Sequence, residues 1–416
     1  MKAVCIPCSG PVDITDFLPV VDHPIFQRLR RTCQLGVNSL IFPGAVHTRF
    51  EHAAGTLARV RRAPVMKMLG APERRTLELF ALLHDIGHGP FSHQIEPVLA
   101  GDHHQQGFSC LEAMSSEIAQ CGVESEMLLR MMRGQERLAL WVTDRNLGAD
   151  KLDYLQRDAF HIGFSGIPDL DLIQQHTVMT ECGLALSEKF IEDGKRLQKF
   201  YSYLHQHGYL NKTALAAQRL LQRALHEELA RRGLSAESGM AQQIWQMGDA
   251  QLSAWLLNGA SPLARTFAAA LQERRLHRTC LCLKPEGYDY VENTVGKPIT
   301  VLCHSRQTLA RICRRCENLD TLREMEDAMA AAVGLAPGDV LLASMPYFTK
   351  LLPRDMRIAN GGENDYWLFD RDRDHRASLE SDYLRTFAVR VVVPPQYREP
   401  LSRKTDLLLS SLGLEQ

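Results

Sequence analysis

The run LLHDIGHGPFSH, residues 82–93, sets a histidine beside an aspartate and adds two further histidines shortly afterwards. Apolar residues at helical spacing precede the pair, and Gly87 then ends the predicted helix. A capped helix end is the ordinary interpretation of an isolated His-Asp pair. Here, however, four more histidines and an arginine lie within about fifty residues of the pair, which is more than core packing requires. We therefore interpret His84 and Asp85 as metal ligands.

Two ligands are too few for an ion that activates water, and neighbouring motifs supply two more. His52 ends the run VHTRFEH at residues 46–52, and Asp150 lies in GADKLDY at residues 148–154. Together with the His-Asp pair they provide two imidazole and two carboxylate groups, a set that suits Mn, Fe, Mg, Co, Ni or Zn. In an octahedral shell about two positions stay open for water and a phosphoryl oxygen. The sequence therefore predicts a hydrolytic site with a divalent metal ion.

Six short motifs follow one another in the order seen in HD-domain phosphohydrolases: FQRLRR at 26–31, QLG at 34–36, FPGA at 42–45, HTRFEH at 47–52, the run from 84 to 93, and DKLDY at 150–154. The chain most resembles the branch that contains the sterile-alpha-motif/HD deoxynucleoside triphosphate triphosphohydrolases and their bacterial relatives. The resemblance covers roughly residues 10 to 215, about half of the chain. It is specific for the superfamily and much less specific for the substrate.

The resemblance implies roles for individual residues. The metal ligands of the family are matched by His52, His84, Asp85 and Asp150. Positions that hold phosphate groups are matched by Arg49, Lys151 and Tyr154, and contacts near the sugar by Gln34 and Asp158. Histidines that line the reacting phosphate are matched by His88, His93 and His104, and the pair that handles the proton by His104 and Glu96, where the family usually has aspartate. A tyrosine that packs near the base or sugar is matched by Tyr209.

Several of these residues also have plainer interpretations. Arg49 and Lys151 lie three residues before and one residue after metal ligands, so they can bring cationic donors to a bound phosphate. Surface ion pairing is nevertheless the common role of such residues. His93 lies beyond the Gly-Pro break and, as a lone histidine, would be a structural donor. His103 and His104 follow a polar turn where either could be solvated, and we assign the site to His104.

One position departs from the triphosphohydrolase pattern. Four residues before the histidine that matches His205, the family carries an arginine that grips the distal phosphates, and this chain has Tyr201. Loss of a bidentate phosphate contact removes about 1.5–3 kcal/mol, which brings triphosphate as the preferred substrate into question. Lys212, on a later turn, is a candidate replacement.

The spacing of apolar residues predicts a mainly α protein. We expect an all-helical HD domain at residues 1–232, a helical connector at 233–280 and a small α+β domain at 281–416. Helices are predicted at 24–35, 51–69, 76–86, 104–120, 150–160 and 188–231. In the C-terminal part, strands are predicted at 299–302, 340–342 and 387–393, and helices at 309–316 and 322–333.

Composition and charge are those of an ordinary soluble protein. The 416 residues are 45% hydrophobic and carry a formal net charge of −1, so there is no global attraction to nucleic acid or to an anionic membrane. Arginines at 28, 30, 31, 59, 61 and 62 form either a solvated helix face or a nucleic-acid surface. The N-terminus does not resemble a signal peptide, and no run of about eighteen apolar residues occurs. We therefore expect a cytoplasmic protein without membrane contact.

The eleven cysteines, in a chain without an export signal, indicate reduced thiols. Two CxxC spacings, Cys5/Cys8 and Cys313/Cys316, admit a structural zinc site with further ligands from Cys280, Cys282 or Cys303. The irregular spacing of the remaining cysteines favours buried or scattered thiols instead.

Together these features predict a metal-dependent phosphohydrolase that acts on nucleotides, with deoxynucleoside triphosphates (dNTPs) as the leading substrate class. Metal-activated water attacks phosphorus, Arg49 and Lys151 neutralise the developing charge, and a histidine protonates the leaving oxygen. The first alternative is a phosphodiesterase, nuclease or nucleotidase acting on DNA or RNA ends, which the arginine clusters and Tyr201 favour. The second is a nucleotide-sensing module that binds without hydrolysis. Because relatives in this family often form oligomers, the resemblance also implies a homo-oligomer.

Overall fold

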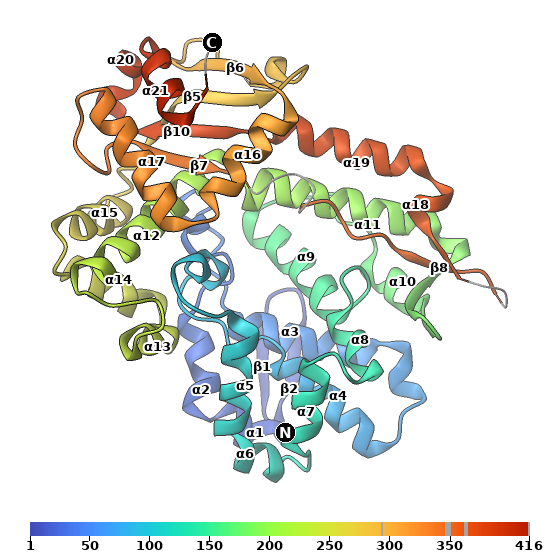
Figure 1. The fold of residues 1–416 in the computed structure, drawn as a ribbon. Coiled ribbons are helices and arrows are strands. Elements are labelled where there is room, and N and C mark those ends of the chain that lie inside the picture. The colour runs from blue at the N-terminus through green and yellow to red at the C-terminus, as the bar shows by residue number, and fades with distance from the viewer. Residues whose placement is uncertain (293, 346–350, 362–364, 415–416) are drawn as a thin grey trace.

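The structure, a computed structural model, describes residues 1–292, 294–345, 351–361 and 365–414. Helices account for most of these residues, and they form two lobes around two separate apolar cores (Figure 1). The predicted mainly α fold is therefore confirmed.

The first lobe is built on three helices that pack together. α3 (Arg49–Arg62) packs against both α4 (Ala71–Leu83) and α9 (Ala149–Ile162). One leucine from each of these helices is completely buried in their shared core: Leu57, Leu77 and Leu152. The other helices of this lobe are α1 (Leu18–Val21), α2 (Pro24–Gln27), α5 (His103–Ala113), α6 (Ser115–Gln120), α7 (Ser125–Met132), α8 (Leu140–Thr143), α10 (Leu170–Gln175) and α11 (Ile191–Leu204).

The first lobe also contains strands that the prediction of an all-helical domain omitted. β1 (Ala3–Ile6) and β2 (Gly10–Asp13) form an antiparallel hairpin, and β3 (Thr177–Thr180) and β4 (Gly183–Ser187) form a second one. Each strand has only four or five residues. Strands this short give too little alternation of apolar and polar residues to be recognised by period.

The helix predicted over residues 188–231 is divided in two. α11 ends in a π-helical turn, His205–Tyr209, and α12 (Lys212–Arg231) begins after it. The Asn211 side chain accepts a hydrogen bond from the backbone of the first turn of α12, and asparagine is a favoured residue for starting a helix in this way. Both end residues of the π-helical turn line the cavity described below.

The second lobe packs helices on a four-stranded sheet in the order β6-β5-β10-β7. β5 and β6 are parallel, whereas β10 is antiparallel to both β5 and β7. The strands are β5 (Arg278–Pro285), β6 (Thr300–His304), β7 (Leu341–Ser344) and β10 (Val389–Val393). The helices are α13 (Gly239–Trp245), α14 (Asp249–Leu257), α15 (Pro262–Gln272), α16 (Arg306–Cys316), α17 (Leu319–Ala332), α20 (Arg398–Ser402) and α21 (Thr405–Leu412). Of the four strands, β5 is the one that the sequence did not predict.

The domain division at residues 232 and 280 stays a prediction. Two segments pack in the structure against the lobe on the other side of a predicted boundary. The sequence assigned α12 to the first domain, but α12 packs against α15 and β7, and its Leu220 and Leu225 belong to the core of the second lobe. In the other direction, the chain returns to the first lobe late in the sequence. β8 (Arg357–Ala359) pairs in parallel with β4, β9 (Tyr366–Trp367) extends the same sheet, and Ile358 is completely buried in the first core.

The returning segment continues into two helices that run back toward the second lobe. α18 (Leu368–Arg371) follows β9, and α19 (Arg373–Thr386) then lies alongside α11 (Figure 1). The Nζ of Lys199 on α11 contacts Asp382 on α19 at 2.8 Å. The two lobes are thus connected by α12 and again by this pair of helices.

Candidate metal centre and active site

Three helical segments carry the four predicted metal ligands. His52 lies in the first turn of α3, where the Thr48 side chain caps the helix. His84 and Asp85 directly follow α4, and Asp150 lies in the first turn of α9. Because α3 packs on both other helices, the three segments meet at one point.

The four ligands converge as the sequence reasoning required. One ligand atom from each residue lies within 4.8 Å of all the others. Oδ1 of Asp150 is 3.0 Å from Nε2 of His52 and 3.5 Å from Nε2 of His84, and Oδ2 of Asp85 is 3.6 Å from Nε2 of His52. A single small ion can therefore reach all four side chains after shifts of their ends.

The surroundings of the two imidazoles fit a metal ion. His52 directs Nδ1 to Asp153 Oδ2 at 2.9 Å, and His84 directs Nδ1 to the Ala81 carbonyl at 2.9 Å. These bonds leave both Nε2 atoms facing the shared space, which is the usual orientation of metal-binding histidines. Nε2 of His84 is buried and has no hydrogen-bond partner, and a buried polar atom of this kind calls for a ligand. The residues present thus fit a divalent metal ion.

Asp153 is itself held in place by Arg157, one turn further along α9. Arg157 donates to the two carboxylate oxygens at 2.8 and 3.0 Å, and both side chains are buried. Gly55 of α3 makes this approach possible, because a Cβ at that position would clash with both side chains. The orientation of His52 therefore depends on an ion pair outside the ligand set.

Without a metal ion the ligands pair with one another. Burial opposes the charged form of His52, but hydrogen bonds with Asp150 and Asp153 outweigh it and raise the pKa of His52 to about 10. Burial also opposes ionisation of Asp150, yet His52 and His84 hold the pKa of Asp150 below its usual range. Ligand nitrogens must lose their protons to bind a metal. Metal binding at this site therefore releases protons.

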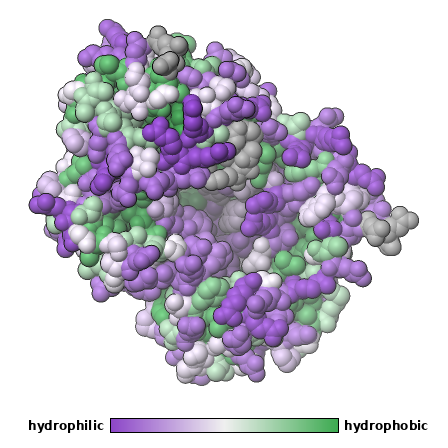
Figure 2. Space-filling model, viewed as in Figure 1, coloured by the Kyte–Doolittle hydropathy of each residue, from purple (hydrophilic) through white to green (hydrophobic). Residues whose placement is uncertain are grey.

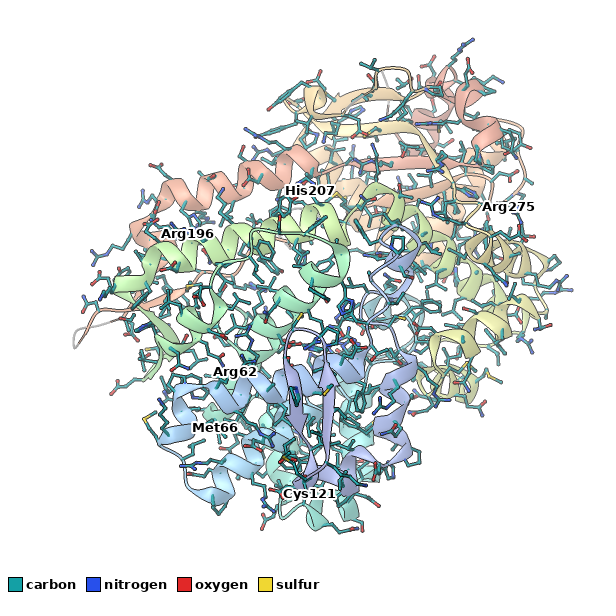
Figure 3. All side chains as sticks on the ribbon, turned by 180° about the vertical axis from the view of Figure 1, so that it is seen from behind. Arg62, Met66, Cys121, Arg196, His207 and Arg275 are labelled. Carbon is teal, nitrogen blue, oxygen red and sulfur yellow. The ribbon has the colours of Figure 1, made fainter. Side chains whose placement is uncertain are left out.

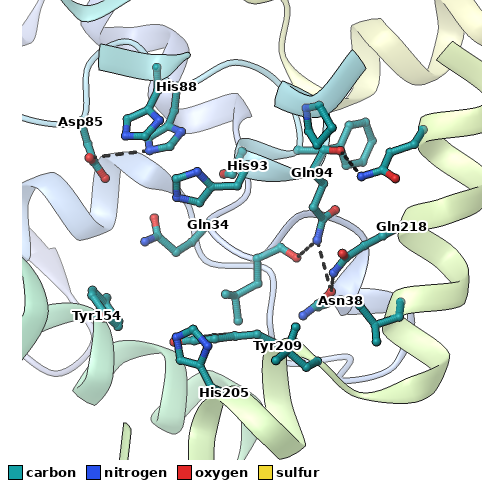
Figure 4. A pocket seen from close by; sticks show the side chains of 18 of the residues that line it. Gln34, Asn38, Asp85, His88, His93, Gln94, Tyr154, His205, Tyr209 and Gln218 are labelled. Atoms are coloured by element: carbon teal, nitrogen blue, oxygen red, sulfur yellow. Dashed lines mark hydrogen bonds and ion pairs between the residues drawn. The ribbon is translucent and has the colours of Figure 1, made fainter. Parts of the chain in front are cut away.

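A second group of titratable residues surrounds Glu96. Its Oε1 lies 2.9 Å from Nδ1 of His103, 3.2 Å from Nδ1 of His93 and 3.6 Å from Nδ1 of His88. His88 also links this group to the metal site, because its Nε2 is 3.6 Å from Oδ1 of Asp85. Figure 4 shows His88 and His93 together on the side of the cavity that carries Asp85.

The structure corrects the predicted partner of Glu96, although His104 does line the cavity. His103, and not His104, pairs with Glu96, while His104 is exposed and packs its ring against that of His103, 4.1 Å between centroids. Both residues lie at the start of α5, where the Asp102 side chain caps the helix. Successive positions on a helix point about 100° apart, so only one of two neighbouring histidines can face Glu96. The motif alone did not indicate which.

The predicted phosphate-binding residues differ in their access to the cavity. Arg49 lines it and donates from Nη1 to Asp85 and from Nε to Ser92 Oγ. Tyr154 also lines it. Lys151 is buried behind it, with Nζ 2.6 Å from Tyr154 Oη and 3.1 Å from the centroid of the Tyr201 ring.

The residues predicted to contact the sugar lie on the cavity wall, but Lys212 does not. Gln34, Asp158 and Tyr209 line the cavity, and Asp158 accepts hydrogen bonds from Tyr209 Oη and from His47 Nε2. The Nζ of Lys212 instead pairs with Glu292 at 3.1 Å, outside the cavity lining. In this structure Lys212 is therefore not placed to replace the missing arginine.

One cavity of about 1060 Å³ joins these residues and continues into the second lobe. Figure 2 shows the hollow between the lobes, with hydrophilic residues around its opening. In Figure 4, Tyr154, His205 and Tyr209 lie on the wall opposite Asp85 and His93, and Gln34 lies between the two walls. Beyond them the lining changes to amide and apolar side chains from both lobes, including Asn38, Gln94, Gln218, Arg219, Cys316, Leu322 and Leu342.

Part of the arginine clusters of the N-terminal region serves the fold. Arg28 is buried and donates to the carbonyls of Ile86 and His88, and so it fixes the loop after the His-Asp pair. Arg59 is also buried and pairs with Asp171, as does Arg62 at the end of α3 (Figure 3). These contacts within the protein explain three of the six arginines, so those three need no nucleic-acid partner.

Two further expectations can be compared with the structure. Among the described residues, the close groups of potential metal ligands contain no cysteine, so the structure offers no zinc site of cysteines. Cys313 and Cys316 are buried and line the far part of the cavity. None of the helices in the described ranges is long and apolar enough to cross a membrane.

Sequence reasoning missed several residues of the site. Arg145 lines the cavity, as do Asn38, Gln94, Gln218 and Arg219. These side chains come from loops and from α12, outside the motifs that carry the resemblance. The one signal in the sequence was the run of glutamine and arginine at helical spacing on α12, which also fits an exposed helix face.

Comparison with known proteins agrees with the geometry. Residues 49–158 match the family model of the HD domain. An uncharacterised protein of Bacillus subtilis, YwfO, is 32% identical over 226 residues, which are 49% of this chain and 51% of that protein. A Dictyostelium discoideum protein named deoxynucleoside triphosphate triphosphohydrolase SAMHD1 homolog is 26% identical over 246 residues, 52% of this chain and 48% of that protein. The chain thus spans about half the length of these curated relatives.

A solved structure is similar over nearly the whole chain. A phosphohydrolase from Bacteroides thetaiotaomicron has a TM-score of 0.71 and covers 95% of this chain and 100% of its own, at 19% sequence identity. At that identity the likeness shows a shared fold. Both lobes, including the one that contributes none of the predicted metal ligands, therefore belong to an architecture that occurs elsewhere.

Proposed function

We propose that this chain, through the HD domain that it carries, is a metal-dependent phosphohydrolase that acts on nucleotides, with dNTPs as the leading substrate class. One observation carries the proposal. The set of His52, His84, Asp85 and Asp150 meets beside a cavity that is lined by Arg49 and by the histidines around Glu96. The substrate class is supported by the printed names of relatives that match about half of this chain.

Arg49 positions positive charge at the reacting phosphate. When bound, a divalent ion would polarise a phosphoryl oxygen and lower the pKa of a water molecule. The guanidinium of Arg49 is fixed by Asp85 on one side and Ser92 on the other, so it needs little reorganisation to stabilise charge that develops on phosphorus oxygens. Its burial strengthens that interaction.

The Glu96 group handles the proton of the leaving oxygen. The attacking water releases one proton to solvent as its oxygen forms a bond to phosphorus. The bond between phosphorus and the leaving oxygen breaks, and the leaving oxygen takes a proton from an imidazolium held by Glu96. Burial and the charge of Arg49 hold the pKa of His88 well below its usual range. The proton is therefore better carried by His93 or His103, both of which contact Glu96.

Arg145 is our candidate for the distal phosphates. Burial raises the pKa of Tyr201, at the position of the missing arginine, to about 12, against the opposing charges of Arg354 and Arg145. Arg145 lines the cavity with an exposed side chain. A flexible surface arginine can clamp a phosphate in two-point fashion. It offers a triphosphate the cation that position 201 lacks.

The two alternatives have weaker support. The nuclease hypothesis relied on arginine clusters, of which Arg28 and Arg59 are buried in structural contacts. The sensor hypothesis leaves the convergence of the four ligands and the adjacent Glu96 group unexplained, because binding alone needs no proton transfer. Homo-oligomer formation and a cytoplasmic location stay predictions of the sequence.

The test combines metal analysis with a substrate screen. Protein as purified is analysed for bound metals, and then dNTPs, nucleoside monophosphates and labelled DNA and RNA oligonucleotides are assayed in parallel for release of triphosphate, phosphate or nucleotide. We expect turnover of dNTPs that is lost in the double variant His84→Ala/Asp85→Ala and kept in His207→Ala, an exposed histidine outside the cavity lining. Full turnover in the double variant would refute the mechanism. Cleavage of oligonucleotides alone would favour the nuclease, and nucleotide binding without turnover the sensor.

A further inference from the structure

The cavity is larger than the phosphate chemistry needs. Its volume of about 1060 Å³ reaches the upper end of the range for sites that enclose a whole small ligand. The metal ligands and the Glu96 group occupy the part within the first lobe. The part between α12, α16, α17 and β7 is lined mainly by apolar side chains, among them Leu215, Leu322, Leu342 and Cys316. An apolar slot of this kind suits a flat ring.

A fixed row of amides leads from one part to the other. Gln94 and Gln218 both donate to Asn38 Oδ1, at 3.2 and 3.3 Å, as Figure 4 shows. Gln222, one turn further along α12, donates to the Gln94 carbonyl at 3.0 Å. These bonds tie α12 of the second lobe to loops of the first. They also hold the polar wall of the cavity rigid.

Arg219 and Glu317 are the charged residues that line the far part of the cavity, and Arg219 is the cationic one. It lines the cavity, and its side chain is 3% exposed. Nε and Nη2 donate to Glu326 at 2.7 and 2.8 Å, but the buried Nη1 has no hydrogen-bond partner. Arginine keeps its proton at all ordinary pH values, so this atom can be satisfied only by an acceptor. The described part of the chain provides none.

Arg223, on the same helix, is the matched comparison for Arg219, because its nitrogens find partners within the protein. Arg223 follows one turn later and uses the same carboxylate, with Nη1 2.8 Å from Glu326 Oε2. Its Nε pairs with Glu227 and its Nη2 with Asp327, and the residue does not line the cavity. Among the described residues, each side-chain nitrogen of Arg223 thus has a partner, whereas Nη1 of Arg219 has none.

We propose that the far part of the cavity holds the heterocyclic base of the nucleotide, and that Arg219 Nη1 donates to a carbonyl oxygen of that base. This inference rests on the proposed function, whose site holds the phosphate end of the same molecule. Guanine, thymine, uracil and cytosine carry a carbonyl oxygen, and adenine carries none. Arg219 is thus a specificity-determining residue that disfavours adenine. Adenine offers only ring nitrogens as acceptors, and it carries an amino group at the position of the carbonyl oxygen of guanine. A donor placed for a carbonyl oxygen therefore disfavours adenine.

The experiment compares kcat/KM for dGTP, dTTP, dCTP and dATP on metal-loaded enzyme. We expect dATP to be at least about 10-fold poorer than the best of the other three. Arg219→Gln should bring that ratio close to one, mainly through KM, whereas Arg223→Gln should keep the ratio of the natural enzyme. Equal use of all four dNTPs by the natural enzyme would overturn the proposal, and so would a ratio that is the same in Arg219→Gln and in the natural enzyme.

A binding measurement separates this proposal from the proposed function and from misfolding. Calorimetric titration of the natural protein with 2′-deoxyguanosine and 2′-deoxyadenosine needs neither turnover nor a variant. Tighter binding of deoxyguanosine without any dNTP hydrolysis would leave the base site standing and overturn the phosphohydrolase. Hydrolysis of dNTPs with equal binding of the two nucleosides would support the phosphohydrolase and overturn the base site. Thermal unfolding of both arginine variants shows whether each is folded at the assay temperature.

Discussion

Replacement of Asp153 by asparagine should weaken metal binding although it removes no ligand. The carboxylate accepts a hydrogen bond from Nδ1 of His52 at 2.9 Å and so directs Nε2 toward the ion. Both side chains are almost fully buried, at 2% and 0% exposure, so water cannot replace the lost partner. Loss of such an outer partner lowers metal affinity by about 10- to 100-fold, or about 1.4–2.7 kcal/mol. The complete burial places our expectation in the upper half of that range.

The assay is calorimetric titration of metal-free protein with Mn²⁺ at fixed pH. Asp153→Asn also deprives Arg157 of its charged partner and will lower stability, so the matched control is Arg157→Met. This control breaks the same ion pair from its other end and leaves the bond between Asp153 and His52 in place. We expect Asp153→Asn to raise the Kd for Mn²⁺ far more than Arg157→Met does. A Kd for Asp153→Asn within twofold of that of the natural protein would refute the reasoning.

Three further predictions concern substrate binding, the core and pH. Arg145→Ala should raise the KM for a dNTP by about 10-fold and leave that for a monophosphate nearly unchanged, because one charge-assisted contact contributes about 1.5–3 kcal/mol; equal effects in steady-state kinetics with the two substrates would contradict its assignment. Leu57→Ala should lower the free energy of unfolding in urea by about 2–5 kcal/mol, since Leu57 is completely buried where α3, α4 and α9 meet, whereas Leu407→Ala, at a residue that is 45% exposed, should change it by less than about 0.5 kcal/mol. Burial lowers the pKa of Lys284 in the folded protein from 10.5 to about 8, so the unfolded chain holds this proton more tightly and the free energy of unfolding should rise between about pH 8 and pH 10.5 by up to about 3 kcal/mol; Lys284→Met should lack this rise, and parallel pH profiles of the two proteins would count against it.

The sequence was sufficient to predict that the four candidate metal ligands meet, because they lie in short motifs with fixed spacing. His84 and Asp85 are adjacent, and His52 and Asp150 each lie in the first turn of a helix whose apolar face is evident from the spacing of its apolar residues. Helical period was enough to place these side chains on segments that pack on one core. The same reasoning predicted most strands and helices of the second lobe.

What the sequence could not predict depends on long-range packing. The choice between His103 and His104 depends on how α5 rotates against Glu96, and neighbours in sequence give no period to decide it. Gln218 and Arg219 became part of the cavity because α12 packs against β7 of the second lobe. No motif predicted that contact, because polar residues on a long helix usually face solvent. β8 has three residues, and its partner β4 lies far earlier in the chain.

The return of the chain through β8 bears on any attempt to separate the lobes. A fragment that stops at residue 232, where composition alone suggests a cut, would lose the strand that covers one edge of β4. It would also uncover the apolar surface against which Met356, Ile358 and Leu368 pack. Unpaired strand edges next to exposed apolar surface promote self-aggregation. A stable catalytic fragment would therefore need residues 356–372 grafted back onto it.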